Sequence, residues 1–171
     1  MTTNTRAFLL FFAIAAPLSA SADDDSRSFL RFKGGIGVIP VSSAPGPALI
    51  AATVQRNIVR DVQPPGQIWV IEDLKADVKA DGNIRVDGRG LLLGGGNNIG
   101  TNAGQSVRAT LICEAAAPFV LRNTNLVPLE ADGDFRIDDT LNPPPPADCA
   151  SPVLLIRNPG GAWFAAGILK R

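Results

Sequence analysis

The chain has 171 residues, a formal net charge of zero at pH 7, and neither histidine nor tyrosine. The lack of histidine excludes Ser-His-Asp and Cys-His catalysis, and it excludes every metal site that needs an imidazole ligand. The balanced charge provides no field of one sign that would attract nucleic acid or an anionic membrane surface, so we expect neither as a partner. Carboxylate chemistry, oxygen-ligated calcium and simple binding remain open.

Residues 1–22 have the pattern of a secretory signal peptide. Arg6 is the only charge in this segment, residues 7–18 are apolar apart from one proline, and small residues at 20–22 suit a cleavage site. The apolar run of about 12 residues is shorter than the roughly 20 that a membrane-spanning helix needs. We therefore predict cleavage after residue 22, a secreted or periplasmic protein, and no membrane insertion of the mature chain.

The mature chain is long enough for one domain with a core of its own. A polar lead, residues 23–28, is expected to be flexible, and residues 29–171 suit a single domain. Its two cysteines, Cys113 and Cys149, form an isolated pair in an exported chain, which predicts one disulfide. In the chain-entropy model such a bond stabilises the fold by roughly 3–4 kcal/mol.

Short strand-like segments alternate with turn signals along the mature chain, and apolar residues show almost no helical spacing. This pattern predicts an all-β fold, a single antiparallel β-sandwich or partly closed barrel. The predicted strands are 29–41 with a bulge at its glycines, 67–78, 83–93, 106–114, 125–130, 135–138, 153–157 and 162–169. Residues 48–60 mix alanine with β-branched residues and form either a short helix or, as we expect, a further strand. The predicted turns and loops are 42–47, 64–66, 81–82, 94–105, 132–133, 143–146 and 158–161.

Three stretches are apolar on both faces, namely 68–71, 153–156 and 163–168. A two-layer sandwich normally shows alternation on its solvent-facing strands, so these stretches require an explanation. They are central strands beneath long loops such as those around Gly94 and Pro143, or the tight ends of a closed barrel, or surfaces that meet another protomer. A homodimer is therefore one of three open alternatives.

One internal repeat is visible: residues 80–87 and 131–138 share five of eight residues. The repeat is either a duplicated binding element or two hairpins that solve the same turn problem, as in pseudo-symmetric halves of a sandwich. Asp-Gly followed by alternating apolar and polar residues is a general hairpin signal. We predict two hairpin turns, with Gly82 and Gly133 at positive φ.

The loop at 94–105 is the most distinctive segment. It lacks the Gly-Lys-Ser/Thr ending of a phosphate-binding loop, but its amides and hydroxyl could hydrogen-bond a sugar. Alternatively, its glycines and asparagines only take left-handed conformations in a long connection. The candidate ligand residues are Asn97, Asn98, Thr101 and Asn102.

The acidic residues form no recognised catalytic or metal motif. Asp132, Asp134, Asp138 and Asp139 do not have the spacing of an EF-hand. A glycosidase pair could be drawn from these aspartates and from Glu72, Glu114 and Glu130, but no pattern brings two of them to one cleft. We therefore assign no catalytic residue, no cofactor and no metal ligand.

Four segments stand out together along the mature chain, namely 32–41, 85–93, 98–101 and 152–157. On these segments the chain resembles a group of secreted bacterial proteins of unknown function, and the resemblance covers most of residues 29–169. It implies a single exported domain and no particular activity. The sequence thus favours an exported β domain with a non-enzymatic binding or structural role, and the alternative is a carbohydrate-binding module or a small carboxylate-dependent glycan-active enzyme.

Overall fold

The computed structural model describes residues 28–45 and 51–170. The predicted signal peptide, and all but the last residue of the predicted lead, lie outside these residues. The described chain is all-β, and none of it forms a helix of the length and apolarity that crossing a membrane requires. The strands are β1 (Leu30–Gly37), β2 (Val41–Pro45), β3 (Ala51–Arg56), β4 (Trp69–Val70), β5 (Asp73–Val78), β6 (Asn83–Arg89), β7 (Leu92–Leu93), β8 (Ser106–Ile112), β9 (Arg122–Asn123), β10 (Val127–Pro128), β11 (Phe135–Thr140), β12 (Val153–Arg157) and β13 (Trp163–Leu169).

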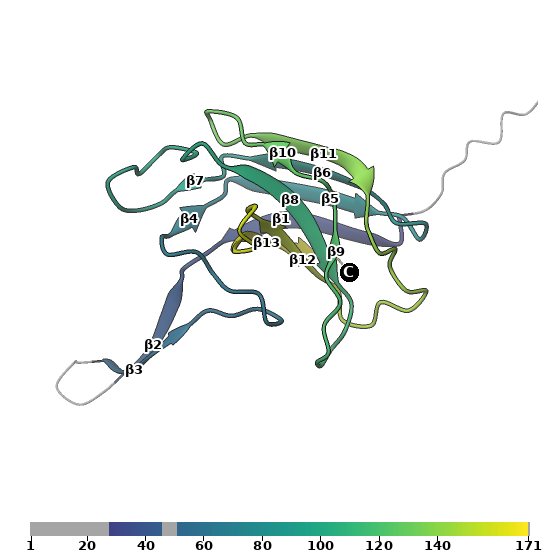
Figure 1. The fold of residues 1–171 in the computed structure, drawn as a ribbon, viewed down its shortest axis with the longest axis horizontal. Helices are drawn as coiled ribbons and strands as arrows, with labels where there is room; N and C mark the ends of the chain where they lie inside the picture. The colour runs from purple at the N-terminus through teal and green to yellow at the C-terminus, as the bar shows by residue number, and fades with distance from the viewer. Residues whose placement is uncertain (1–27, 46–50, 171) are drawn as a thin grey trace, which may run out of the picture.

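One antiparallel sheet curls almost into a closed barrel (Figure 1). Its strand order is β10-β8-β12-β13-β1-β5-β6-β11, and β9 also pairs with β8. The two ends of the sheet meet where Asn123 and Asn142 exchange two backbone hydrogen bonds of 2.9 Å each. Because β9 and β10 both pair with β8, they act as one interrupted strand between β8 and β11. The predicted all-β fold with a partly closed barrel is confirmed.

The barrel contains two three-stranded meanders, β1–β5–β6 and β8–β9/β10–β11. They meet directly at β6 and β11, and on the opposite side the β12–β13 hairpin joins them. The internal repeat lies at the direct contact. Its register pairs Arg85 with Asp138 and Arg136 with Asp87, and both pairs form ion pairs, with N–O distances of 2.8 and 3.7 Å. The repeated strands are therefore neighbours related by a local two-fold axis.

Both repeated turns have the predicted conformation. Gly82 has a φ of 92° and Gly133 a φ of 86°. In each turn the glycine N–H donates to the carbonyl three residues earlier, and the aspartate side chain accepts the N–H two residues later. The repeat thus reflects two hairpins that solve the same turn problem.

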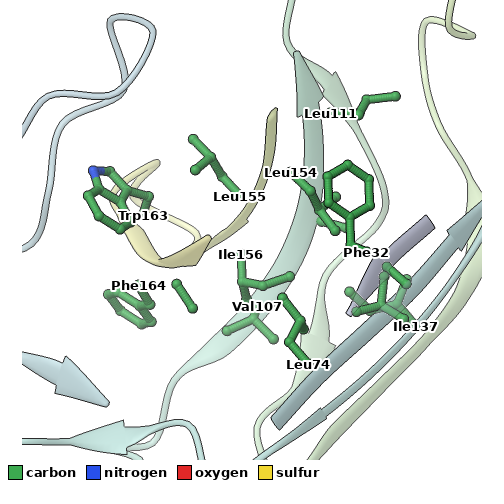
Figure 2. Packing of buried hydrophobic residues seen from close by; sticks show 14 of the residues in the cluster. Phe32, Leu74, Val107, Leu111, Ile137, Leu154, Leu155, Ile156, Trp163 and Phe164 are labelled. Atoms are coloured by element: carbon green, nitrogen blue, oxygen red, sulfur yellow. The ribbon is translucent and has the colours of Figure 1, made fainter. Parts of the chain in front are cut away.

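Side chains fill the barrel interior. Inward positions on β5, β6 and β11 alternate with charged outward positions, and the fold leaves space for large rings by placing glycine opposite them. A Cβ on Gly88 would lie 2.1 Å from the ring of Phe135, and one on Gly167 would lie 3.2 Å from the ring of Phe32. Figure 2 shows the packed cluster around Phe32, which also includes Leu74, Val107, Leu111, Ile137, Leu154 and Ile156. The interior is therefore a hydrophobic core rather than a ligand cavity.

The β12–β13 hairpin is also covered on its outer side. Leu155 is fully buried although its neighbours in β12 point into the barrel, and Figure 2 shows it on the same side of the hairpin as Trp163. The covering segment is 57–66. The backbone N–H of Trp163 donates to the carbonyl of Gln63, and its indole N–H donates to the carbonyl of Asn57, both at 3.0 Å. Loop cover thus explains this stretch, but the covering loop is neither of the two that the sequence suggested.

The short β4–β7 pair lies at one end of the barrel (Figure 1). Trp69 in β4 stacks on Phe164 of β13, with ring centroids 3.9 Å apart and planes 10° from parallel. This stack closes the hydrophobic core at that end.

Four sequence expectations were wrong. The strand predicted at 67–78 is two strands, β4 and β5, because the chain changes direction at Ile71 and Glu72; Val70 is consequently exposed and Trp69 is buried. The strand predicted at 83–93 is likewise two strands, β6 and β7, because the chain turns at Gly90, whose φ is 62°. The strand predicted at 29–41 ends at Gly37, and Val41 already belongs to β2. The predicted turn at 42–47 is largely strand β2, which pairs with β3 in a hairpin projecting from the barrel (Figure 1). A strand that pairs on one side only can tolerate a serine- and proline-rich sequence.

The two repeated turns offer a matched stability test. Gly82→Ala should lower the free energy of unfolding by about 1 kcal/mol, because alanine resists positive φ. Gly133→Ala should cost roughly twice as much or more, since its Cβ would lie 2.5 Å from the backbone nitrogen of Leu91, whereas the nearest atom at Gly82 is a proline side-chain carbon at 3.3 Å. Urea unfolding measures both losses. Equal losses would contradict the packing difference.

Candidate ligand-binding site

Hydrogen bonds from its side chains hold the Asn-rich loop between β7 and β8 in place, both within the loop and to the segment before the Asp132-Gly133 turn. The Asn102 amide donates to the carbonyls of Leu129 and Glu130, at 2.8 and 2.9 Å, and the Thr101 hydroxyl donates to the carbonyl of Asn98 at 2.8 Å. Asn97 and Asn98 are exposed and line neither of the two pockets described below. These bonds account for the loop as a structural connection, and sugar binding by it stays a prediction.

The four aspartates considered as calcium ligands have separate partners. Asp132 accepts the N–H of Asp134, Asp134 accepts the N–H of Gly90, Asp138 pairs with Arg85, and Asp139 accepts the N–H of Asn125. Across the ranges that the structure describes, no three His, Cys, Asp or Glu residues are grouped to hold a metal ion.

A charged groove of about 450 Å³ crosses the outer side of β5, β6 and β11. Four acids that the sequence did not bring together line it, but cations accompany them. Asp73 pairs with Lys75 at 3.1 Å, and Asp87 lies 3.7 Å from Arg136. The hydrogen bond from Lys75 lowers the pKa of Asp73, whereas a general acid needs a raised pKa. The residues that line the charged groove are Asp73, Lys75, Asp87, Gly88, Arg89, Glu130, Asp134, Phe135 and Arg136.

A second pocket, of about 310 Å³, lies where the covering segment 57–66 meets the β8–β9 loop and the β12–β13 turn. Two arginines line it, so we call it the arginine pocket. Its residues are Arg60, Asp61, Val62, Gln63, Phe119, Leu121, Arg157, Gly160, Gly161 and Ala162.

A strained turn forms one wall of the arginine pocket. Val59 and Val62 exchange two backbone hydrogen bonds, which leaves Arg60 and Asp61 as the central residues of a two-residue turn. Their φ values are 49° and 63°, a conformation usually occupied by Asn-Gly. Such strain costs on the order of 1 kcal/mol or more at each residue and persists only where surrounding contacts enforce it.

The enforcing contacts come from the Arg60 side chain. Its guanidinium donates to the carbonyl of Glu114 and, at 2.7 Å, to the hydroxyl of Ser151, and it lies 5.3 Å from the centroid of the Phe119 ring. The turn is thereby fixed to two other segments that are distant in the sequence.

The predicted disulfide between Cys113 and Cys149 is present. It joins the same two segments that Arg60 contacts, since Glu114 follows Cys113 directly and the N–H of Ser151 donates to the carbonyl of Cys113. Both cysteines are buried, and their disulfide bond indicates an oxidising environment of the kind found outside the cytoplasm.

An ion pair shapes the loop that carries Phe119 and Leu121. Glu114 lies 2.7 Å from Arg122, and their side chains are only 25% and 7% exposed. The Glu114 carboxylate also accepts backbone N–H bonds, and Arg122 is the main cause that lowers its pKa to about 2. Glu114 therefore acts as a structural anion.

Arg157 and Arg108 face each other without a carboxylate partner. They are directly opposite residues of β12 and β8, and both are half-buried. The described residues form five ion pairs, and none of them includes Arg60, Arg108 or Arg157. Desolvation, followed by the charge of Arg108, lowers the pKa of Arg157.

The sequence did not predict the arginine pocket, because its walls come from three segments joined only by tertiary contacts. One signal was available: Arg108 and Arg157 are each the single charge in an otherwise uncharged strand. Comparison with known proteins yields no match to a protein-family model, a curated protein or a solved structure.

The Glu114–Arg122 pair predicts a pH-dependent stability. Glu114→Gln should lower the free energy of unfolding at pH 7 by about 3 kcal/mol, because it leaves a buried arginine unpaired. The folded pKa of about 2 lies below the ordinary 4.5, so this stabilisation is present above pH 4.5 and is lost as the pH falls towards 2. The wild-type advantage in urea unfolding should therefore shrink over that range. Glu130→Gln, at an exposed site, is the control, and a pH-independent difference would contradict the assignment.

Proposed function

We propose that this protein is an exported, non-enzymatic binding protein whose ligand occupies the arginine pocket. One observation carries the proposal: the strained Arg60–Asp61 turn is held beside the half-buried Arg157 by contacts from two distant segments. Backbone strain that the surroundings enforce is concentrated at ligand sites.

Because side chains fill the barrel interior, a ligand has to bind on the outer side of the barrel. Large side chains occupy the interior, so a ligand cannot enter it without displacing the core. The volume of the arginine pocket, about 310 Å³, lies at the lower end of the range for small-molecule sites. A small ligand therefore suits it better than a long polymer.

Binding without catalysis fits the chemistry of this pocket. Glycoside hydrolysis requires two carboxyl groups that face one bond, and Asp61 is the only carboxylate among the lining residues. Glu114 is nearby, but its ion pair with Arg122 keeps it ionised and engaged.

Export is supported by the apolar segment at 7–18 and by the disulfide. Both are expected of a protein that acts outside the reducing cytoplasm.

The second candidate is a carbohydrate-binding module or glycan-active enzyme that uses the charged groove. The observation in its favour is that Glu130 and Asp134 lie in one groove with Asp73 and Asp87. The ion pairs there already satisfy Asp73 and Asp87, so we place it second.

The proposal predicts saturable small-molecule binding that maps to the arginine pocket. The exported protein, purified with its disulfide intact, is screened by thermal shift against small acids, sugars and amines, and each hit is mapped by amide NMR shifts. Residues 60–63, 119–121 and 157–162 should respond. Shifts confined to the charged groove would favour the second candidate instead.

A filling substitution separates the pocket from other surfaces. Gly160→Phe should weaken binding by at least about tenfold by occupying the pocket, and a Cβ there meets no atom closer than 3.5 Å, so the backbone tolerates it. Gly66→Phe, where a Cβ meets nothing within 4 Å and which lines neither pocket, is the control. Equal affinity in both variants, or no saturable binding of any compound, would overturn the proposal.

A further inference from the structure

We infer that the arginine pocket recognises an oxyanion, a carboxylate or phosphate group, with an apolar portion of the ligand against Phe119 and Leu121. This inference rests on the proposed function and names the ligand chemistry of the same pocket. Its basis is the imbalance of charge and of hydrogen bonding around Arg157.

Positive charge is in excess at the pocket. Arg60, Arg108 and Arg157 lie at or beside it, and Asp61 is the one carboxylate that lines it. Like charges directly opposite each other across two strands destabilise a sheet, and here the two arginines are also half-buried. In addition, Nε of Arg108 is buried without a hydrogen-bond partner in the part of the chain that the structure describes. A bound anion beside Arg157 would compensate the excess of positive charge.

Arg157 has donors available for such an anion. Its Nε donates to the carbonyl of Gly161 at 2.8 Å, which fixes the plane of the guanidinium. Its Nη1 makes only long contacts, of 3.5 Å to the Thr110 hydroxyl and 3.4 Å to the Asn123 amide oxygen. Nη2 has no hydrogen-bond partner within the described residues. A planar guanidinium whose Nη1 makes only long contacts, and whose Nη2 makes none with the described residues, suits the two oxygens of a carboxylate or phosphate.

The other walls restrict the ligand further. Arg60 is held by Glu114, Ser151 and the Phe119 ring, so its charge stays beside the pocket. Phe119 and Leu121 are half-buried and provide an apolar wall. Asp61 disfavours ligands of high negative charge, which favours a monoanion carrying an apolar group over a multiply charged phosphate.

Probe compounds test the anion and the apolar wall separately. Isothermal titration of the exported protein uses benzoate, acetate, inorganic phosphate and the neutral analogue benzamide, all at one chloride concentration and one ionic strength. Benzoate should saturate and should bind more tightly than acetate. Benzamide should bind at least about tenfold more weakly, because it lacks the charge that strengthens the hydrogen bonds. Phosphate binding tighter than benzoate would place the ligand among phosphates, and the oxyanion site would stand.

Variants test the residues. Arg157→Met and Arg108→Met each keep an apolar stem and remove one charge, and both should weaken benzoate binding by about tenfold or more. In the absence of benzoate both should melt a few degrees higher than the wild type, since they remove the unpaired like charges. Arg136→Met is the control, because that arginine is exposed, pairs with Asp87 of the neighbouring strand β6, and does not line the arginine pocket. It should change neither benzoate affinity nor benzoate-dependent melting.

The outcomes that overturn the inference differ from those that overturn the proposed function. Equal binding of benzoate and benzamide, or equal stabilisation by chloride at matched ionic strength, would remove the oxyanion site. Binding of a neutral sugar in the pocket without any anion would do the same and leave the proposed function standing. A pocket that binds nothing would end both. If Arg157→Met does not fold, Arg108→Met provides the same comparison.

Discussion

The β12–β13 hairpin is apolar on both sides, and this constraint organises the rest of the molecule. Its inner side completes the barrel core, but Leu155 and Trp163 on the outer side also have to be removed from water. The chain meets this requirement with the segment 57–66, whose backbone accepts both N–H groups of Trp163. Two apolar faces on one hairpin therefore require a second layer, and the arginine pocket lies at the edge of that layer.

The second layer is held by links that converge on one point. Arg60 reaches Glu114 and Ser151, and the disulfide joins the same two segments next to these contacts. The disulfide, the Glu114–Arg122 ion pair and the Arg60 guanidinium thus fix three loops to one another. The strain of the Arg60–Asp61 turn is tolerated because these links leave the turn no other position.

Most of the strands and both Asp-Gly turns could be predicted, because each depends on residues that are near in sequence. The disulfide could be predicted because an exported chain with two cysteines has one possible pairing. The break at Ile71 and Glu72 had one signal in the sequence, because Glu72 stands at a position where the alternation of 68–78 requires an apolar residue. That signal does not show that the chain leaves one sheet for another at this point. The arginine pocket could not be predicted from the sequence for a related reason. Arg60 and Arg157 come together because segment 57–66 covers the outer apolar face of β12–β13, and no local sequence pattern shows where that segment packs.

The topology also governs the order in which the barrel can form. The first and last described strands, β1 and β13, are hydrogen-bonded neighbours, and β13 together with β12 bridges the two meanders. The hydrogen bonds around the barrel cannot be completed until this terminal hairpin is in place. Closure of the barrel therefore depends on contacts between distant parts of the chain, and such contacts form slowly. The other strands therefore form an open sheet until the last two are in place. Loss of the terminal hairpin would leave β1 and β8 as bare edges, which are templates for pairing with other chains.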